Sequence, residues 1–266
     1  MDQLSENLPG IFNLRSLLQS NGHIEYGLEG KPGVRLILKD TDDRHYSNAQ
    51  LDDYQGRPDG KTFTWRPPLR MTVRAYASHA AEELRGTAGF GFWSQPLLPG
   101  RILPFRPVIP GTVWFFFSSK PSDMSLAKGV PGYGWKAATL DATRLPFWLL
   151  LPSAPIAVLL MRIPALYRWF YPVGQWAAGI SEALIEVDVR EPHLYRLDWL
   201  RGSAEFYVDD RLVHRSPFAP SRSLGFVAWS DNRYAIVTPQ GRIAAGLLPI
   251  PGRQWWALEM LTITLL

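Results

Sequence analysis

Apolar and polar residues alternate with a period of two in short runs along much of the chain. The runs lie at residues 34–39, 70–78, 89–93, 112–118, 183–190, 194–200, 204–208, 224–230 and 256–265. A period of two places alternate side chains on opposite faces of a strand, so each run predicts a strand with one face in a core. The 22 glycines and 23 prolines separate these runs at short intervals, as turns between strands do. The pattern predicts a mostly-β sandwich of two antiparallel sheets, formed as a single domain by residues 1–266.

Residues 145–180 depart from this alternation. They read LPFWLLLPSAPIAVLLMRIPALYRWFYPVGQWAAGI, are apolar and aromatic, and carry no charge over 145–161. A helix that crosses a bilayer needs about 20 such residues, whereas Pro146, Pro152 and Pro155 interrupt this run. We therefore expect a hydrophobic insertion of short helices rather than a transmembrane span. Such an insertion is typical of a lid or pocket wall, with an oligomer interface or packing against a sheet as alternatives.

Residues 193–214 carry a resemblance to a known family. They read HLYRLDWLRGSAEFYVDDRLVH, and the matching positions are His193, Tyr195, Trp199, Tyr207, Val208 and Asp209. The segment resembles a strand pair of the family 16 glycoside hydrolases and related concanavalin A-like jelly rolls, with Asp210 where glycine is usual. Residues 86–96, GTAGFGFWSQP, resemble the strand that precedes the catalytic strand in those enzymes. The resemblance implies a concanavalin A-like jelly-roll β-sandwich.

The catalytic motif of that family, Glu-x-Asp-x-x-Glu, is absent from the expected strand. By order along the chain that strand is residues 111–119, which contain no carboxylate and place Trp114 and Phe116 where acids are expected. Residues 186–191, EVDVRE, match the motif in letters, but they directly precede the 193–214 segment. We interpret them as a solvent-facing strand and expect Glu186 and Asp188 outside the main cleft. A retaining glycosidase needs two carboxyl groups on one site, so these departures weigh against glycoside hydrolysis.

Candidate site residues come from the aromatic strands and from the ends of polar strands. Gln50 and Asp52 share a strand face, as do Trp229 and Asp231. Each set has a structural alternative, either an exposed edge strand or a turn that bonds its own backbone. We assign catalytic roles to Asp231, Tyr234 and His79. We assign ligand binding to Gln50, Asp52, Arg74, Phe92, Trp93, Trp114, Phe116, Trp229 and Asn232.

These assignments favour an apolar or lipid-like small-molecule ligand in an aromatic pocket on the concave face. If the protein is an enzyme, the sequence favours a cofactor-independent cyclase or isomerase that acts by shape and a few polar groups. One alternative is a carbohydrate-active protein, either a family 16-like hydrolase or a lectin. The other is a non-catalytic interaction domain, which would make peripheral membrane contact through residues 145–180.

Composition and short motifs limit which partners, metals and cofactors we expect. The net charge is +4, but the arginines are scattered, so we expect no nucleic-acid partner. No cysteine is present, the histidines lack metal-ligand spacing, and no cofactor motif occurs, so we expect neither a metal nor a cofactor. Asp40, Asp42 and Asp43 lack the glycine and distal glutamate of a calcium loop and predict a solvated turn. The polar first residues do not resemble a signal peptide, which favours a cytoplasmic location.

Overall fold

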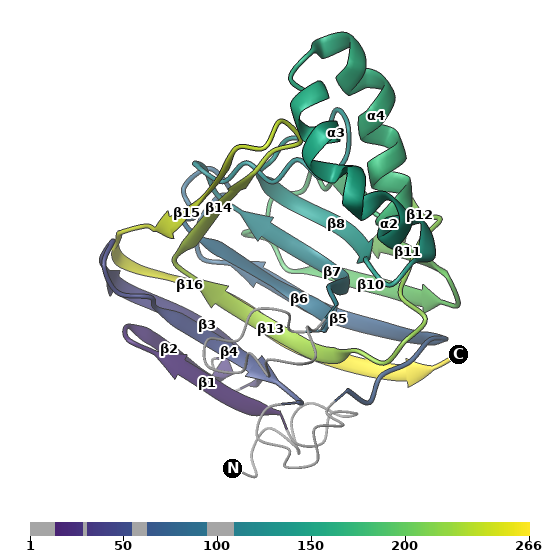
Figure 1. Ribbon diagram of the computed structural model, residues 1–266. Coiled ribbons are helices and arrows are strands. Elements are labelled where there is room, and N and C mark those ends of the chain that lie inside the picture. The colour runs from purple at the N-terminus through teal and green to yellow at the C-terminus, as the bar shows by residue number, and fades with distance from the viewer. Residues whose placement is uncertain (1–13, 29–30, 55–62, 95–108) are drawn as a thin grey trace.

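The computed structural model describes residues 14–28, 31–54, 63–94 and 109–266, and these residues form two large antiparallel sheets. The first sheet has the order β1 (Arg15–Gln19), β4 (Asn48–Asp52), β13 (Gly225–Asp231), β6 (Thr87–Trp93), β7 (Gly111–Ser118), β8 (Gly134–Asp141), β9 (Ser181–Leu184). The second has the order β12 (Arg211–Ser216), β11 (Ser203–Val208), β10 (His193–Leu200), β5 (Leu69–Ala77), β16 (Ile250–Leu265), β3 (Lys31–Thr41), β2 (Gly22–Leu28). A separate hairpin pairs β14 (Arg233–Val237) with β15 (Ile243–Leu247). The sheets pack face to face (Figure 1), which confirms the predicted sandwich.

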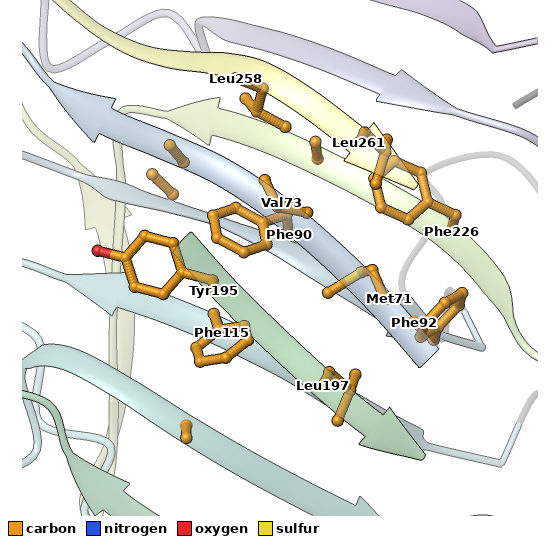
Figure 2. Close-up of a cluster of buried hydrophobic side chains, with 14 of the residues drawn as sticks. Met71, Val73, Phe90, Phe92, Phe115, Tyr195, Leu197, Phe226, Leu258 and Leu261 are labelled. Atoms are coloured by element: carbon orange, nitrogen blue, oxygen red, sulfur yellow. The ribbon is translucent and has the colours of Figure 1, made fainter. Parts of the chain in front are cut away.

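The core lies between the sheets and is built from every second residue of their strands. Phe90 and Phe115 of the first sheet point toward Tyr195, Leu197 and Met71 of the second (Figure 2). The ring of Phe115 lies 5.5 Å from that of Phe90 and 5.2 Å from that of Tyr195, centroid to centroid. Burial of each such side chain stabilises the fold by about 1.5–3 kcal/mol, so the inward half of each alternating run provides the main stabilisation of the sandwich.

The segment with the family resemblance forms consecutive antiparallel strands of the second sheet. Leu200 pairs with Ser203 across a tight turn between β10 and β11. The next turn has Asp209 and Asp210 at φ angles of 48° and 63°, which is left-handed backbone that favours glycine but tolerates aspartate. Asp209 also accepts a hydrogen bond from the backbone N–H of Leu194 at 2.9 Å. Asp210 therefore replaces the usual glycine without changing the turn.

The strand predicted over residues 183–190 is shorter than expected. Strand β9 ends at Leu184, and the residues that follow form a loop. The carboxylate of Asp188 accepts hydrogen bonds from both the backbone N–H and the guanidinium of Arg190, which closes a local turn. Local bonds of this kind compete with pairing in a sheet, so the alternating letters of 186–191 do not form a strand.

The insertion between β8 and β9 forms the expected short helices. They are α2 (Leu145–Leu150), the 3₁₀ turn η1 (Leu151–Ser153), α3 (Ala154–Leu160) and α4 (Pro164–Ala177). The prolines that were expected to interrupt one long helix instead occupy the first turns of these separate helices. Among the described residues, no helix has the length and apolar character that crossing a bilayer requires.

Candidate functional site

An aromatic cluster lies on the outer face of the first sheet, opposite the core. It comprises Trp93 of β6, Trp114 and Phe116 of β7, and Trp229 of β13. Each residue directly follows or precedes a core residue, so alternation alone directs these four rings outward. Trp229 is buried, while the other three side chains are half-buried and keep part of their surface in solvent. We call these four residues the aromatic platform.

Two glycines of β6 make room for the platform. Gly89 pairs with both Phe116 and Trp229, and Gly91 pairs with Trp114. A side chain at Gly89 would collide with the Trp229 ring, and one at Gly91 would collide with Trp114. The alternation of glycine and phenylalanine in residues 89–92 therefore has a structural cause. The phenylalanines fill the core, and the glycines leave room for the large rings on the outer face.

The four rings contact one another as a continuous surface. The Trp114 ring lies 5.0 Å from Trp229, 6.0 Å from Trp93 and 5.4 Å from Phe116, centroid to centroid. The planes of Trp93 and Trp229 differ by only 6°, and those of Trp114 and Phe116 by 15°. These separations are those of stacked or offset aromatic pairs. The four rings therefore form one continuous apolar surface. It consists of two nearly parallel pairs whose planes are tilted by 31–40° relative to each other.

Polar side chains hold two of the indoles in place. Trp229 donates from Nε1 to Thr87 Oγ1 at 3.0 Å, and that hydroxyl donates to Asp231 Oδ1 at 2.8 Å. Trp93 donates from Nε1 to the Tyr54 hydroxyl at 2.5 Å. Each indole N–H is thus satisfied, which fixes the ring planes before any ligand arrives.

Two acidic residues near the platform, Asp231 and Asp52, accept further hydrogen bonds. Asp231 also accepts from the Tyr46 hydroxyl and the Arg233 backbone N–H, both at 3.1 Å. Complete burial of its carboxyl group raises the pKa of Asp231 above the ordinary value. Asp52 accepts from Gln50 Nε2 at 2.8 Å. Burial and the negative charge of Asp52 raise the pKa of Tyr54, so that phenol stays protonated.

The structure brings seven of the predicted site residues to this face. Trp229 pairs with Gln50 across β13 and β4, which places Gln50 and Asp52 beside the platform. The seven are Gln50, Asp52, Trp93, Trp114, Phe116, Trp229 and Asp231. Alternation within each strand predicted that these side chains share its outward face, and pairing between the strands brings them together.

Asn232 and Tyr234 follow the same strand but have different surroundings. Asn232 is fully buried, accepts from the Ser47 backbone N–H at 2.9 Å, and donates to the carbonyl oxygens of Asp42 and His45. It therefore fixes the loop that leads into β4. Tyr234 lies on β14 and packs across Gly246 of β15.

Three other predicted site residues lie away from the platform. Phe92 is buried in the core, 5.1 Å from the Trp199 ring, because it has the inward parity of β6. Arg74 is on β5 of the second sheet, where it forms an ion pair with Glu259 at 2.9 Å. His79 is exposed beyond the end of β5 and hydrogen-bonds with Ser78 Oγ at 2.7 Å.

A buried ion pair that the sequence analysis missed lies on the same outer face. Lys136 Nζ of β8 is 3.3 Å from Glu182 Oε2 of β9, and both side chains are almost fully buried. Burial lowers the pKa of Lys136 and raises the pKa of Glu182. Glu182 Oε1 also accepts from the backbone N–H groups of Leu126 and Ala127 at 2.8 Å each. The pair thereby fixes the loop after β7 over this side of the sheet.

A pocket of about 590 Å³ lies at one end of the sandwich. Its polar lining includes Glu82, Arg85, Lys120, Glu186 and Asp188. Glu186 and Asp188, which we expected outside the main cleft, line this pocket, because β9 ends early and the loop turns into it. The pocket is separate from the aromatic platform. The guanidinium and backbone N–H of Arg190 lower the pKa of Asp188 to about 2.

The acidic turn after β3 has no metal-binding arrangement. Asp42 accepts from the backbone N–H groups of Arg44 and His45, and Asp40 accepts from that of Gly252. In the part of the chain that the structure describes, no three histidine or acidic side chains are grouped so that they could hold a metal ion.

No protein-family model and no curated protein matches the sequence. Solved structures do match. The mixed-linkage glucan family 16 glycoside hydrolase of Bacteroides ovatus, in complex with a product, gives a TM-score of 0.50 at 8% identity, covering 97% of this chain and 98% of that one. A Bacteroides ovatus family 16 endo-glucanase gives 0.49 at 9% identity, covering 96% and 97%. A Clostridium perfringens endo-β-galactosidase gives 0.47 at 13% identity, covering 95% of this chain and only 59% of that one.

The first of these likenesses extends over nearly the whole chain and shows the fold. The chain is a concanavalin A-like jelly-roll sandwich, as the resemblance of residues 193–214 implied. The expectation of an apolar small-molecule ligand, with cyclase or isomerase chemistry, is corrected by this comparison. The solved structure that shares the sandwich over nearly the whole chain is a glycoside hydrolase, not a cyclase or isomerase. In the described part of the chain, the aromatic residues that led to the apolar interpretation are divided between the core and the platform.

Proposed function

We propose that the outer face of the first sheet binds a carbohydrate chain and does not hydrolyse it. The observation that carries this proposal is the aromatic platform, in which three half-buried rings and the buried Trp229 contact one another on one face as two nearly parallel pairs. The mixed-linkage glucan enzyme with the same fold, solved with its product, supports a saccharide as the ligand class.

A saccharide suits this surface for chemical reasons. One face of a pyranose ring presents mainly C–H groups, which pack on a flat aromatic ring, while its hydroxyl groups remain at the edge. Trp93, Trp114 and Phe116 offer such flat rings, and Gln50 of β4 supplies an amide beside them. The indoles of Trp93 and Trp229 are already fixed by hydrogen bonds, so little conformational entropy is lost when a sugar stacks on the platform.

The absence of hydrolysis follows from the carboxyl groups. A retaining glycosidase needs two carboxyl groups about 5–5.5 Å apart, on either side of the scissile bond. Strand β7 presents Thr112, Trp114 and Phe116 to the outer face instead. The nearby Asp52 and Asp231 are buried, and their oxygens accept hydrogen bonds from the groups that position the platform.

Affinity electrophoresis in gels that contain soluble mixed-linkage β-glucan, xyloglucan or galactan tests binding. We expect at least one polysaccharide to retard the wild type, and Trp114→Ala to weaken binding by about 10-fold or more, because the lost ring contact is worth roughly 1.5–3 kcal/mol. The matched control is Trp255→Ala, which removes a half-buried tryptophan from β16 of the second sheet. Equal retardation of the Trp114→Ala variant and the wild type would contradict the proposal.

A reducing-sugar assay on the retarding polysaccharide tests the second half of the proposal. We expect no release of reducing ends above the buffer control. Hydrolysis that Glu186→Gln abolishes would instead place a catalytic site in the 590 Å³ pocket, and the non-hydrolytic proposal would then be wrong. The cytoplasmic location expected from the sequence stays a prediction.

A further inference from the structure

Among the described residues, most of the exposed large apolar side chains lie in the helical insertion. From Thr143 to Trp176 no residue is buried, and Trp169 is 78% exposed. The exposed large apolar side chains of the insertion are Leu145, Trp148, Leu149, Leu150, Leu151, Ile156, Leu159, Ile163, Trp169, Phe170, Val173 and Trp176. Contiguous exposed apolar surface of this kind marks an interaction site on a protein that otherwise buries its core.

The base of the insertion is fixed to the sandwich, so this surface has a defined direction. Tyr171 donates from its hydroxyl to the carbonyl oxygen of Ser125, and Gln175 donates to that of Leu126. The Arg144 guanidinium stacks over the ring of Phe218 at 4.4 Å and donates to the carbonyl oxygen of Trp176. The helices therefore project beyond the end of the sandwich (Figure 1) instead of covering the platform.

The β14–β15 hairpin extends the same apolar projection. Its turn lies beside α3 (Figure 1), where Arg162 Nε is 3.4 Å from the carbonyl oxygen of Gln240. A side chain at Gly241 would collide with Val158, so the turn and the helix are in close contact. Near this turn Ile243 is 79% exposed and Val237 is also exposed. The helices and the hairpin tip thus form one surface, which we call the apolar projection (residues 144–176 and 237–243).

All the charged side chains of the apolar projection are positive. No acidic residue occurs between Asp141 and Glu182, or between Asp231 and Glu259. The charged side chains of the projection are Arg144, Arg162, Arg168 and Arg242. The only hydroxyl of residues 145–161, that of Ser153, donates to the carbonyl oxygen of Leu150 at 2.7 Å. This surface therefore combines positive charge with a stretch, residues 145–161, whose side chains offer almost no hydrogen-bonding groups.

We propose that the apolar projection docks on the surface of an anionic lipid bilayer, with its short helices inserted into the interface. Helix α4 has 14 residues and, at 1.5 Å per residue, spans about 21 Å, which is shorter than the hydrocarbon core of about 30 Å. Apolar side chains around the helices would enter the acyl region. Tryptophan and arginine suit the headgroup level, where anionic lipids attract the positive charge.

A bilayer fits this surface better than a protein partner does. A protein interface has an apolar centre with a polar rim and about one hydrogen bond per 100–200 Å². Here exposed apolar residues occur on all three helices and on the hairpin, and arginine is the only charged side chain among them. A bilayer offers a continuous apolar medium that can receive several helices and a hairpin tip at once, without a complementary shape.

Vesicle co-flotation of the full chain tests the proposal, with vesicles of phosphatidylcholine alone and of phosphatidylcholine mixed with phosphatidylserine. We expect the wild type to float with the mixed vesicles, and the paired variant Leu149→Ser/Trp169→Ser to lose at least 10-fold in partition coefficient. The control is Leu265→Ser, since Leu265 is 79% exposed at the end of β16, outside the projection. Arg162→Gln with Arg168→Gln should reduce the preference for phosphatidylserine by several-fold, and added salt should do the same.

Three results would overturn the proposal. The first is that the wild type floats with neither kind of vesicle. The second is that the Leu149→Ser/Trp169→Ser variant floats as well as the wild type does. The third is that the wild type binds no vesicles but forms a dimer, and that the Leu149→Ser/Trp169→Ser variant is a monomer. In that case the apolar projection would bind a second copy of the chain instead of a bilayer. The Leu149→Ser/Trp169→Ser variant should leave retardation by polysaccharide unchanged, so failure of membrane docking and failure of carbohydrate binding can be told apart.

Discussion

The sandwich interior and the apolar projection have similar residue types but opposite environments. Phe90, Phe115 and Trp135 lie in the core with almost no exposed surface, whereas Trp148, Trp169 and Phe170 are exposed to solvent. The strands place apolar residues on one face and bury that face against a second sheet. Helices α2 and α3 consist entirely of apolar residues, so no single contact can cover them. Apolar content therefore does not determine burial, because burial depends on whether the apolar residues share a face that a partner element can cover.

The largest effect should come from a core aromatic. We expect Phe115→Ala to lower the free energy of unfolding by about 3–5 kcal/mol, because it leaves a cavity among Phe90, Trp135 and Tyr195. Denaturation by urea measures this change. The neighbouring Phe116→Ala, which removes an outward ring of the platform, is the control and should cost less than half as much. Equal losses for both variants would show that the two faces of β7 are packed alike.

The next effect should come from the buried ion pair. Lys136→Met leaves the Glu182 carboxyl group without its cation in a buried site and should lower the free energy of unfolding by about 3 kcal/mol. Adding Glu182→Gln should recover most of this loss, because the amide is neutral and still accepts from Leu126 and Ala127. A double variant no more stable than Lys136→Met would contradict the assigned role of the charge.

The pH dependence of the free energy of unfolding tests whether Asp231 is buried on the outer face of the first sheet. Because its pKa is raised in the folded state, its protonated form favours folding. Its contribution to stability is greatest below the unfolded pKa near 4 and is lost as the pH rises through the folded pKa, at up to about 1.4 kcal/mol per pH unit. Asp231→Asn should remove this fall from a series of urea denaturations between pH 4 and pH 7.

Asp42 provides a control of opposite sign for that series. Hydrogen bonds from His45 and Arg44 lower the pKa of its exposed carboxyl group to about 2. Its contribution is therefore present above pH 4 and lost toward pH 2. Asp42→Asn should leave the slope between pH 4 and pH 7 as in the wild type. A wild-type slope that survives Asp231→Asn would show that another group is responsible.

The smallest effect should come from the apolar projection. Trp169→Ser removes a side chain that is 78% exposed and should change the free energy of unfolding by no more than about 0.5 kcal/mol. Urea denaturation at low protein concentration, without lipid, measures this. A loss above about 1.5 kcal/mol would show that the projection is packed in solution, and the contrast with the sandwich interior would disappear.

Local features of the site could be predicted because they depend on residues close in sequence. Alternation placed Trp114 and Phe116 on the face opposite Phe115, and Trp229 on the face of Asp231. The prolines of residues 146–155 predicted a break into short helices. The resemblance of residues 193–214 implied the jelly roll. Each of these inferences requires only the geometry of one strand, one turn or one helix start.

Other features depend on pairing between distant strands, which alternation does not report. Arg74 and Trp114 lie on equally regular strands, yet β5 belongs to the second sheet and β7 to the first. Lys136 and Glu182 are 46 residues apart and meet only because β8 pairs with β9. The glycines at 89 and 91 gain their role from rings on the neighbouring strands.

Local periodicity, and with it most of the strands, their inward and outward residues and the short apolar helices, follows from the sequence alone. Three features depend on the tertiary structure: which strands share a sheet, that the outward aromatics of β6, β7 and β13 form one platform, and that the helices project from the sandwich. The physical reason is that side-chain alternation follows from backbone geometry within a few residues. Strand neighbours, in contrast, are chosen by hydrogen bonds and packing between segments far apart in the chain.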